Sequence, residues 1–422
     1  MALYKGYEQY KDSGLDWLGQ IPVSWNLISL RYLCEVNTGS KDTQDSVEEG
    51  LYPFFVRSQI VERIGEYTHD EEAVMTAGDG AGVGRVFHHY NGKFSAHQRV
   101  YIFTKFKYCT ARFIYYYLKS NLAFEVLRSN AKSTVDSLRR PMLTNFPVAL
   151  PTLQEQDGIT MFLDKKISEI DSLIEDKERL VSLMEEQRRA VITQAVTKGL
   201  KSGVKMKDSG VEWIGLIPET WEIKKIKYKF AIQKRINNHS DPVVLSLTQK
   251  GLKIKNLEDF SGQHADSYAN YQIVNKGDFV MNSMDLLTGF VDCSPFDGVT
   301  SPDYRVFTQL NLKECGQYYL FYFQMCYFSR IFYGHGQGVS KFGRWRLQTD
   351  VFKEFPIMVP PIEEQFEIAS FIETKVRDID ELIQLNQDYI SMLGEYRQTL
   401  IFEAITGKID VRELMMQEIV TA

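Results

Sequence analysis

Cysteine is scarce in this 422-residue sequence, where five scattered residues form no Cys-x-x-Cys pair. We therefore expect neither a disulfide framework nor a thiolate zinc site, and we expect a reducing, cytoplasmic setting. Long apolar runs are also missing. The richest stretch, residues 318–328, is aromatic and shorter than the roughly 18 apolar residues of a membrane span. Because the N-terminal residues also hold no apolar core of signal-peptide length, we expect a soluble protein without membrane association.

An excess of positive charge is missing as well. Lys and Arg number 49 against 55 Asp and Glu, so the formal net charge is −6. This balance excludes a uniformly basic surface that would coat nucleic acid, but it allows local basic patches. Hydrophobic residues make up 44% and charged residues 25% of the chain. Such a composition is typical of a folded protein, and the length favours two domains or more.

Catalytic motifs are missing too. The glycine-rich run Gly78–Gly84 is not followed by the Lys-Ser/Thr of a phosphate loop, and a strand pattern continues after it, so we predict a turn between strands. No Asn/Asp-Pro-Pro-Tyr/Phe sequence is present to hold a flipped adenine. Residues His88, His89 and His97 have no carboxylate or cysteine at ligand spacing. We predict no catalytic site, cofactor site or metal site in this chain.

The chain does contain an internal duplication. The segment Lys11–Pro22 returns as Lys207–Pro218, and each copy is followed by a further tryptophan, Trp25 or Trp221. A second marker, Phe-Pro-x-x-x-Pro-x-x-x-Glu-Gln, begins at Phe146 and again at residue 355. Two long matches in the same order indicate two halves built to one plan.

A long helical pattern follows the second marker in each half. Apolar residues recur at alternating steps of four and three from Leu163 to Ala195 and from Ile372 to Ala404. A repeat of 3.5 residues kept over this length predicts a coiled coil, although two long core helices would share part of the pattern. Polar residues interrupt both seams at the same two places, and these are Lys177, Arg188, Asn386 and Arg397. Two helices separated by a globular domain pair most simply as antiparallel neighbours, and ~35 paired residues would extend roughly 50 Å.

Between the markers the halves diverge. Each mixes β-type runs (Val100–Phe103 and Phe279–Met281) with an aromatic helical pattern (Phe113–Leu127 and Tyr318–Phe332). The predicted fold class is therefore mixed α/β, with two globular domains separated by two long helices that form an antiparallel coiled coil in a pseudo-two-fold repeat. The predicted boundaries are 1–150 and 201–359 for the domains, 151–200 and 360–410 for the helices, and 411–422 for a C-terminal tail.

Basic residues cluster inside the diverged domains. Between residues 224 and 255, nine Lys and Arg are opposed by Asp241 alone. The segment 340–346 places three cations around two aromatic residues, and the segment 128–140 mixes cations with Ser, Thr and Asn. Taken singly, each cluster is better explained as a solvated basic face. The last two lie at equivalent positions upstream of the Phe-Pro marker, which favours contact with DNA phosphates and bases.

Taken together, these motifs resemble the specificity (S) subunit of type I restriction–modification systems along essentially the whole chain. The resemblance rests on the doubled Trp-x-Gly-x-Ile-Pro-x-x-Trp, the doubled Phe-Pro marker, and the Lys276–Phe279 element leading to Ser301–Val306. The segment Ser95–Tyr101 is similar to that last element, and Ser133–Val135 resembles a family loop. The resemblance implies two target-recognition domains, each reading half of a bipartite double-stranded DNA site, with the helices setting the unread spacer.

The resemblance also implies partners and a set of DNA contacts. Two methylation subunits would bind S-adenosylmethionine, and two restriction subunits would bind ATP and Mg, so this chain would be non-catalytic and hold no cofactor. A two-headed protein-binding scaffold, without DNA recognition, is the alternative. The predicted DNA-binding residues are Gln98, Arg99, Lys132, Ser133, Thr134, Arg139, Asn282, Ser283, Tyr304, Arg305, Ser340, Lys341, Arg344 and Arg346.

Overall fold

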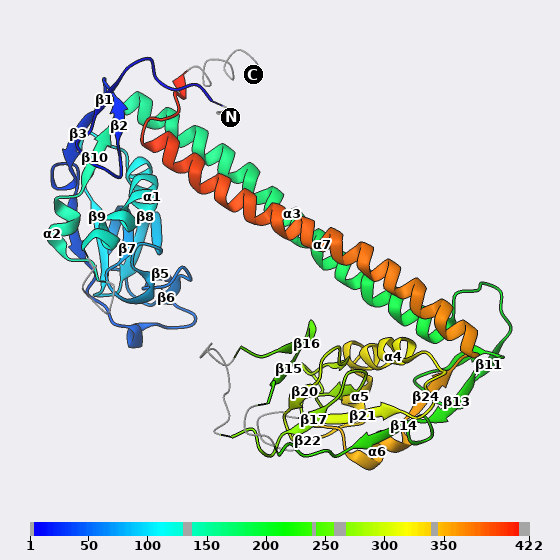
Figure 1. Cartoon of the computed structure of the whole chain (residues 1–422). Coiled ribbons are helices and arrows are strands. Elements are labelled where there is room, and N and C mark those ends of the chain that lie inside the picture. Colours follow the sequence, from blue (N-terminus) through cyan, green and yellow to red (C-terminus); the bar gives the residue numbers. More distant parts are fainter. Residues whose placement is uncertain (1–3, 130–136, 239–241, 257–266, 339–344, 413–422) are drawn as a thin grey trace. The chain divides into compact units, whose positions relative to one another are not determined.

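Two compact units make up the chain in a computed structural model, one formed by residues 1–178 with 388–422 and the other by residues 179–387. The residues that the structure describes are 4–129, 137–238, 242–256, 267–338 and 345–412. Each unit contains a mixed helix-and-strand domain and parts of two long helices (Figure 1). This architecture confirms the predicted fold class.

The two long helices are α3 (Leu153–Lys198) and α7 (Ile362–Ile405). They run antiparallel, because contacts along them ascend in α3 and descend in α7. Asp171 pairs with Arg397. Further along, the Lys177 ammonium lies 5.3 Å from the Tyr389 ring centre, and Arg188 Nε lies 2.8 Å from Asp380 Oδ1. Figure 1 shows the two helices side by side.

Polar residues in the predicted seams have identifiable partners. The Arg188 and Arg397 side chains reach across to a carboxylate of the other helix. Asn386 instead donates its side-chain N–H to the carbonyl of Leu382 in its own helix, at 2.8 Å. The cross-helix pairs fix register, because a shifted pairing would separate each arginine from its carboxylate.

The first domain contains a six-stranded sheet in the order β4-β9-β7-β8-β5-β6, antiparallel except for the parallel pair β5–β8. Helix α1 packs on strands β7 and β8 of this sheet. The sheet strands are β4 (Glu35–Thr38), β5 (Tyr52–Phe55), β6 (Glu62–Ile64), β7 (His69–Ala77), β8 (Phe87–Ala96) and β9 (Val100–Thr104). The remaining elements are β1 (Tyr10–Asp12), β2 (Gln20–Pro22), β3 (Asn26–Ser29), β10 (Pro147–Leu150), α1 (Ala111–Ser129), α2 (Arg140–Thr144), and the 3-10 turns η1 (Leu30–Tyr32), η2 (Thr43–Asp45) and η3 (Gly80–Gly82).

The second domain contains a four-stranded antiparallel sheet in the order β14-β21-β18-β19 and several two-stranded ribbons. The sheet strands are β14 (Phe230–Gln233), β18 (Phe279–Met281), β19 (Val291–Cys293) and β21 (Arg305–Gln309). The ribbon strands are β11 (Met206–Asp208), β12 (Leu216–Pro218), β13 (Glu222–Lys225), β15 (Leu245–Thr248), β16 (Gly251–Ile254), β17 (Gln272–Val274), β20 (Gly298–Thr300), β22 (Gln337–Gly338), β23 (Trp345–Arg346) and β24 (Pro356–Val359). The helices are α4 (Gly316–Phe328), α5 (Ile331–Gly334), α6 (Thr349–Glu354) and the 3-10 turn η4 (Ile226–Tyr228).

Helix α4 accounts for the aromatic run that is too short for a membrane span. Its residues are buried on all sides from Tyr318 to Phe323, as expected of a helix that lies inside a core. The predicted helix over Tyr318–Phe332 is divided in the structure, because Arg330 adopts a left-handed φ of 57° and separates α4 from α5. No helix in the described part of the chain is both long and apolar enough to cross a membrane.

The repeated tryptophans lie where each domain joins its long helix. The Trp25 indole donates to Glu155 Oε1 at 3.1 Å, and the Trp221 indole donates to Glu364 Oε2 at 3.0 Å. Both rings are fully buried. The glutamate of each Glu-Gln marker therefore binds the second tryptophan of the marker that precedes its domain.

The glutamines of these markers also connect each domain to the start of its long helix. Gln156 accepts from the backbone N–H of Thr110 at 2.9 Å, and Gln365 accepts from that of Cys315 at 3.0 Å. Their amide groups donate to the carbonyls of Pro151 and Pro360, respectively. Because both glutamines are fully buried, these bonds satisfy polar groups that would otherwise be costly to bury. The motifs that reveal the duplication thus have a structural role.

Candidate nucleic-acid interface

Three of the predicted DNA-binding residues come together in the first domain. Gln98 and Arg99 lie exposed in the turn between β8 and β9, and Arg139 lies exposed just before α2. The Leu138 N–H donates to the Gly78 carbonyl at 2.8 Å, and the Gly78 N–H donates to the Arg99 carbonyl at 2.8 Å. These backbone bonds gather the turn, the glycine-rich run and the segment before α2 at one edge of the domain.

Two carboxylates bind side chains of the 97–99 turn. Gln98 donates its side-chain N–H to Asp42 Oδ2 at 2.6 Å. Arg99 donates from Nη1 to Asp79 Oδ2 at 2.6 Å, and Arg57 donates to the other oxygen of Asp79 at 2.8 Å. Partial burial opposes ionisation of Asp79, but the hydrogen bonds from the two arginines lower the pKa of its carboxyl below the usual range. Arg57 and Asp79 are not among the DNA-binding residues that the sequence predicts.

The glycine-rich run forms the turn that the sequence predicts. It connects β7 to β8 and contains the single 3-10 turn η3. Neither Arg57 nor Asp79 carries a local sequence signal, because their pairing spans 22 residues of chain. A glycine run between two strands indicates a close backbone approach, and this is the one feature that points to the position.

In the second domain, Arg346 lies exposed on β23, where it pairs with Gln337 of β22. Asn282 is half-buried, and its side-chain oxygen accepts from the backbone N–H groups of Met284 and Asp285. Tyr304 is also half-buried, and burial raises the pKa of its hydroxyl. These three side chains remain candidates for contact with a ligand.

Arg305 and Ser283 lie inside the second domain. Arg305 is 6% exposed, and its guanidinium donates to the Leu347 carbonyl at 2.9 Å and lies 4.5 Å from the Phe352 ring centre. Burial lowers its pKa to about 10. Ser283, which is 3% exposed, accepts from the Leu347 N–H through its carbonyl at 3.0 Å. Both residues therefore support the segment that carries Arg346, and their burial removes them from the exposed interface.

The remaining predicted DNA-binding residues lie outside the described part of the chain. These are Lys132, Ser133, Thr134, Ser340, Lys341 and Arg344.

The lysine run near residue 224 is less basic in the fold than in the sequence. Glu354 forms ion pairs with Lys225 and Lys227 at 2.6 Å and 2.5 Å. Hydrogen bonds from these two lysines lower the pKa of Glu354 to about 2. Lys229 pairs at 2.6 Å with Glu314, which is largely buried. Asp241 is the only acidic residue within the segment itself, but glutamates distant in sequence pair with three of its nine cations.

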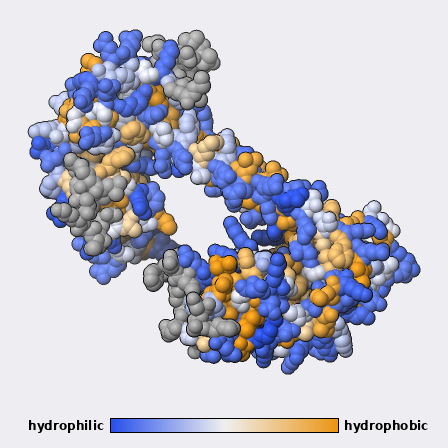
Figure 2. Space-filling view, in the orientation of Figure 1, coloured by the Kyte–Doolittle hydropathy of each residue, from blue (hydrophilic) through white to orange (hydrophobic). Residues whose placement is uncertain are grey.

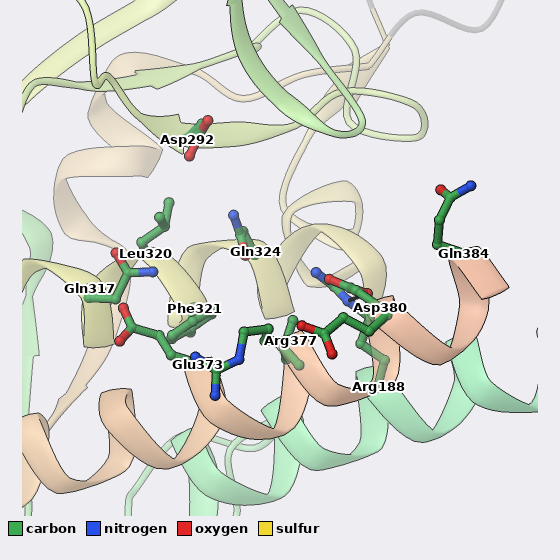
Figure 3. A pocket seen from close by; sticks show the side chains of 12 residues that line it. Arg188, Asp292, Gln317, Leu320, Phe321, Gln324, Glu373, Arg377, Asp380 and Gln384 are labelled. Atoms are coloured by element: carbon green, nitrogen blue, oxygen red, sulfur yellow. Dashed lines mark hydrogen bonds and ion pairs between the residues drawn. The ribbon is translucent and has the colours of Figure 1, made fainter.

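A groove in the second unit lies between α4 and the paired helices (Figure 3). It encloses about 550 Å³ and combines Arg188 and Arg377 with Glu373 and Asp380. Its four carboxylates (Asp292, Glu373, Asp380 and Glu381) outnumber its two arginines, so it does not offer a positive site for phosphate. Among the described residues, its lining includes no serine, cysteine or histidine. Among the described residues, no three His, Cys, Asp or Glu side chains are placed to share a metal ion.

The visible surface of each unit is mainly hydrophilic, with smaller hydrophobic patches (Figure 2). On the long helices, the exposed apolar side chains include Leu183 at 56% and Leu385 at 64%. A surface of this kind, with exposed arginines on turns, suits polar recognition better than burial of a large apolar ligand.

Comparison with known proteins identifies the family. The type I restriction modification DNA specificity domain matches residues 22–181 and, a second time, residues 218–388. The chain belongs to the type I restriction–modification DNA specificity (S subunit) family. The two matches coincide with the duplication, and each covers one domain together with part of its long helix.

Relatives match the S subunit over nearly its full length. The EcoDI specificity subunit of Escherichia coli is 23% identical over 414 residues, which cover 93% of this chain and 90% of that protein. The MjaVIII specificity subunit of Methanocaldococcus jannaschii is 24% identical over 427 residues, with 94% and 95% coverage. A solved chain from work on complex assembly and conformational transition of the type I R-M system has a TM-score of 0.68 and 11% identity, and the match covers 92% of this chain and 99% of that one. This last likeness concerns the fold.

Proposed function

We propose that the chain binds double-stranded DNA as the specificity subunit of a type I restriction–modification complex. Each recognition domain reads one half of a bipartite site, and the paired helices set the unread spacer between the halves. The observation that carries this proposal is the doubled family match, because one chain holds two DNA specificity domains, each joined to its own long helix. Two divergent domains on a duplicated frame suit two different half-sites.

The exposed arginines of the first and second domains support DNA as the ligand. Arg99 and Arg346 lie on turns or short ribbons, where side chains can reach the edges of base pairs. Arginine recognises guanine through two hydrogen bonds to O6 and N7 in the major groove. Phosphate contacts would come from other cations and would supply affinity without sequence preference.

The chemistry of the complex belongs to its partners in this proposal. Two methylation subunits bind S-adenosylmethionine and methylate adenine, and two restriction subunits use ATP and Mg to translocate and cut DNA. The chain itself is non-catalytic and holds no cofactor, and the complex acts on DNA in the cytoplasm. Purified alone, the chain should show neither methyl transfer nor cleavage, and activity from a partner-free preparation would refute this assignment.

Methylation mapping tests the proposal directly. Single-molecule sequencing of DNA from cells that carry this chain with its methylation partner should reveal one bipartite motif, which disappears when the gene for this chain is deleted. A duplex holding that motif should then bind the purified complex in a salt-dependent manner, since neutralised phosphates release counterions. A protein-binding scaffold would give neither the motif nor the salt-dependent binding.

Exchange of one domain tests the division into half-sites. Replacing residues 26–145 by the corresponding segment of a relative should change one half of the motif and leave the other half and the spacer unchanged. A change in both halves, or in the spacer, would contradict the modular assignment.

A further inference from the structure

One carboxylate joins two exposed arginines at the edge of the first domain. Asp79 Oδ1 accepts from Arg57 Nη1 at 2.8 Å, and Asp79 Oδ2 accepts from Arg99 Nη1 at 2.6 Å. The side chains of Arg57 and Arg99 are 42% and 59% exposed, whereas that of Asp79 is 26% exposed. The Asp79 side chain is therefore more buried than the two arginine side chains, which extend further into solvent.

The glycine-rich run accounts for this arrangement. A Cβ at Gly78 would lie 2.9 Å from the Arg99 carbonyl oxygen, and a Cβ at Gly82 would lie 2.7 Å from the Arg57 carbonyl oxygen. Both distances are too short for a side-chain carbon. Glycine thus allows the loop backbone to lie against the backbones of both arginines, with Asp79 between the two points of contact.

The backbone at Asp79 is also held by a third segment, residues 137–138. Its backbone forms an antiparallel bridge with Ser137, and the Leu138 N–H donates to the Gly78 carbonyl at 2.8 Å. Segments from three separate parts of the domain therefore fix the position of this carboxylate. The loop thus holds Asp79 in place, and it is not followed by the Lys-Ser/Thr of a phosphate loop.

Each arginine keeps part of its donor set for a ligand. A guanidinium has five N–H donors, and each of these two groups binds Asp79 through Nη1 alone. Among the described residues, no other side chain forms a hydrogen bond with either guanidinium. A guanidinium held on one edge can offer the other edge to a planar acceptor pair with little further loss of rotamer freedom.

We propose that Asp79 is a positioning residue that holds Arg57 and Arg99 as a pair of guanine-reading side chains for the first half-site. This inference rests on the proposed DNA-binding function. Guanine presents two neutral acceptors, O6 and N7, to one guanidinium in the major groove. A phosphate beside the same arginines would meet the negative charge of Asp79, and this repulsion favours the base edge over the backbone as the ligand.

The test uses the complex of this chain with its methylation partners and duplexes derived from the mapped motif. Binding is compared between the motif and duplexes in which each base pair of the first half-site is replaced in turn. Arg57→Lys and Arg99→Lys keep the charge but lose the planar donor pair. Each should lower discrimination at one G·C pair by roughly five- to 150-fold, with little change in the dependence of binding on salt.

Asp79→Asn provides the distinctive result. It should lower discrimination at both of these G·C pairs while binding to an unrelated duplex stays the same or becomes tighter, because a negative charge is removed. In an Arg57→Lys/Arg99→Lys background, Asp79→Asn should cause no further loss of discrimination. Glu35→Gln is the matched control, since Glu35 pairs at 2.9 Å with the exposed Lys105 of the same domain, and it should leave discrimination unchanged.

Three results would overturn the inference. Asp79→Asn could keep full discrimination at every pair, the lysine variants could discriminate as well as the wild type, or the arginine variants could weaken all duplexes alike with a smaller salt slope, as phosphate contacts would. Thermal unfolding of each variant identifies any loss of fold. If Asp79→Asn does not fold, the discrimination measured for Arg57→Lys and Arg99→Lys tests the inference. If the wild-type complex shows no preference for the mapped motif, the proposed function fails, whereas unchanged variants of a discriminating complex refute this inference alone.

Discussion

In this S subunit, residues at equivalent positions of the two halves have the same environment in some cases and different environments in others. Trp25 and Trp221 occupy equivalent places, and each indole binds a glutamate at the start of a long helix. Arg99 and Arg305 also occupy equivalent places in similar segments, yet Arg99 is exposed and Arg305 is buried. The same residue type at the same motif position is thus exposed in one domain and packs inside the other.

The indole–glutamate bonds give a prediction for stability. Trp221→Phe and Glu364→Ala should show a coupling free energy of about 1–2 kcal/mol in a double-mutant cycle measured by urea unfolding, because a hydrogen bond to a charged group is lost. Trp213→Phe is the control, since the buried Nε1 of Trp213 has no hydrogen-bond partner among the described residues. Its coupling to Glu364→Ala should be near zero, and a coupling as large as that of Trp221 would contradict the assignment.

The two arginines of the second domain give another prediction. Arg305→Ala should lower the free energy of unfolding by about 2–4 kcal/mol, because it leaves the buried Leu347 carbonyl without its donor and opens a cavity beside Phe352. Arg346→Ala, at an exposed position, should change stability by less than about 0.5 kcal/mol and should weaken DNA binding instead. Thermal unfolding and duplex titration measure the two effects. If Arg305→Ala left stability unchanged, a structural role would be excluded.

At the scale of elements, the paired helices combine an apolar seam with charged contacts across it. The apolar contacts supply most of the stability, because exposed ion pairs contribute only about 0–1 kcal/mol each. The charged pairs instead specify which level of α3 faces which level of α7. Asp171 with Arg397 and Arg188 with Asp380 agree on one antiparallel register.

Charge exchange tests this register. Arg188→Asp and Asp380→Arg should each lower the free energy of unfolding by about 0.5–1 kcal/mol, because like charges then face each other. The double variant Arg188→Asp/Asp380→Arg should recover most of that loss by restoring an opposite-charge pair. Urea unfolding of the three variants is the measurement. A double variant that is no more stable than the single variants would show that these two positions do not face each other.

At the scale of the whole molecule, the proposed function requires that the length of the paired helices sets the spacer between the two half-sites. Removing residues 174–180 and 388–394, which face each other in the observed register, preserves the heptad seam on both sides. The deletion shortens the pair by ~10 Å, equivalent to about three base pairs of rise and some 100° of rotation about the duplex. The complex should then no longer methylate the original motif.

Methylation mapping with the double deletion measures this outcome. Circular dichroism of the purified complex should show that the shortened chain is folded. The single deletion of 174–180 is the control, and it should lower stability because the seams no longer match. A folded double deletion that still methylates the original motif with its original spacer would mean that the helices serve only to bind partners.

The sequence by itself determined the duplication, the two long helices, the mixed domains and the family. Heptad spacing indicates which residues face a partner helix, and the repeated markers indicate where each domain joins its long helix. Each of these patterns can be recognised within a few tens of residues. The predicted strand Phe279–Met281 and the turn at Gly78–Gly84 were also confirmed for this reason. Each depends on the conformation of neighbouring residues.

The tertiary structure decided the environment of single side chains. Burial of Arg305, neutralisation of Lys225 by Glu354 at a separation of 129 residues, and the meeting of Arg57 with Asp79 all depend on segments distant in the chain. Side-chain charge and local spacing cannot indicate which cation has a carboxylate beside it. Periodic structure follows from local backbone geometry, whereas exposure and ion pairing follow from which strands and loops the fold brings together.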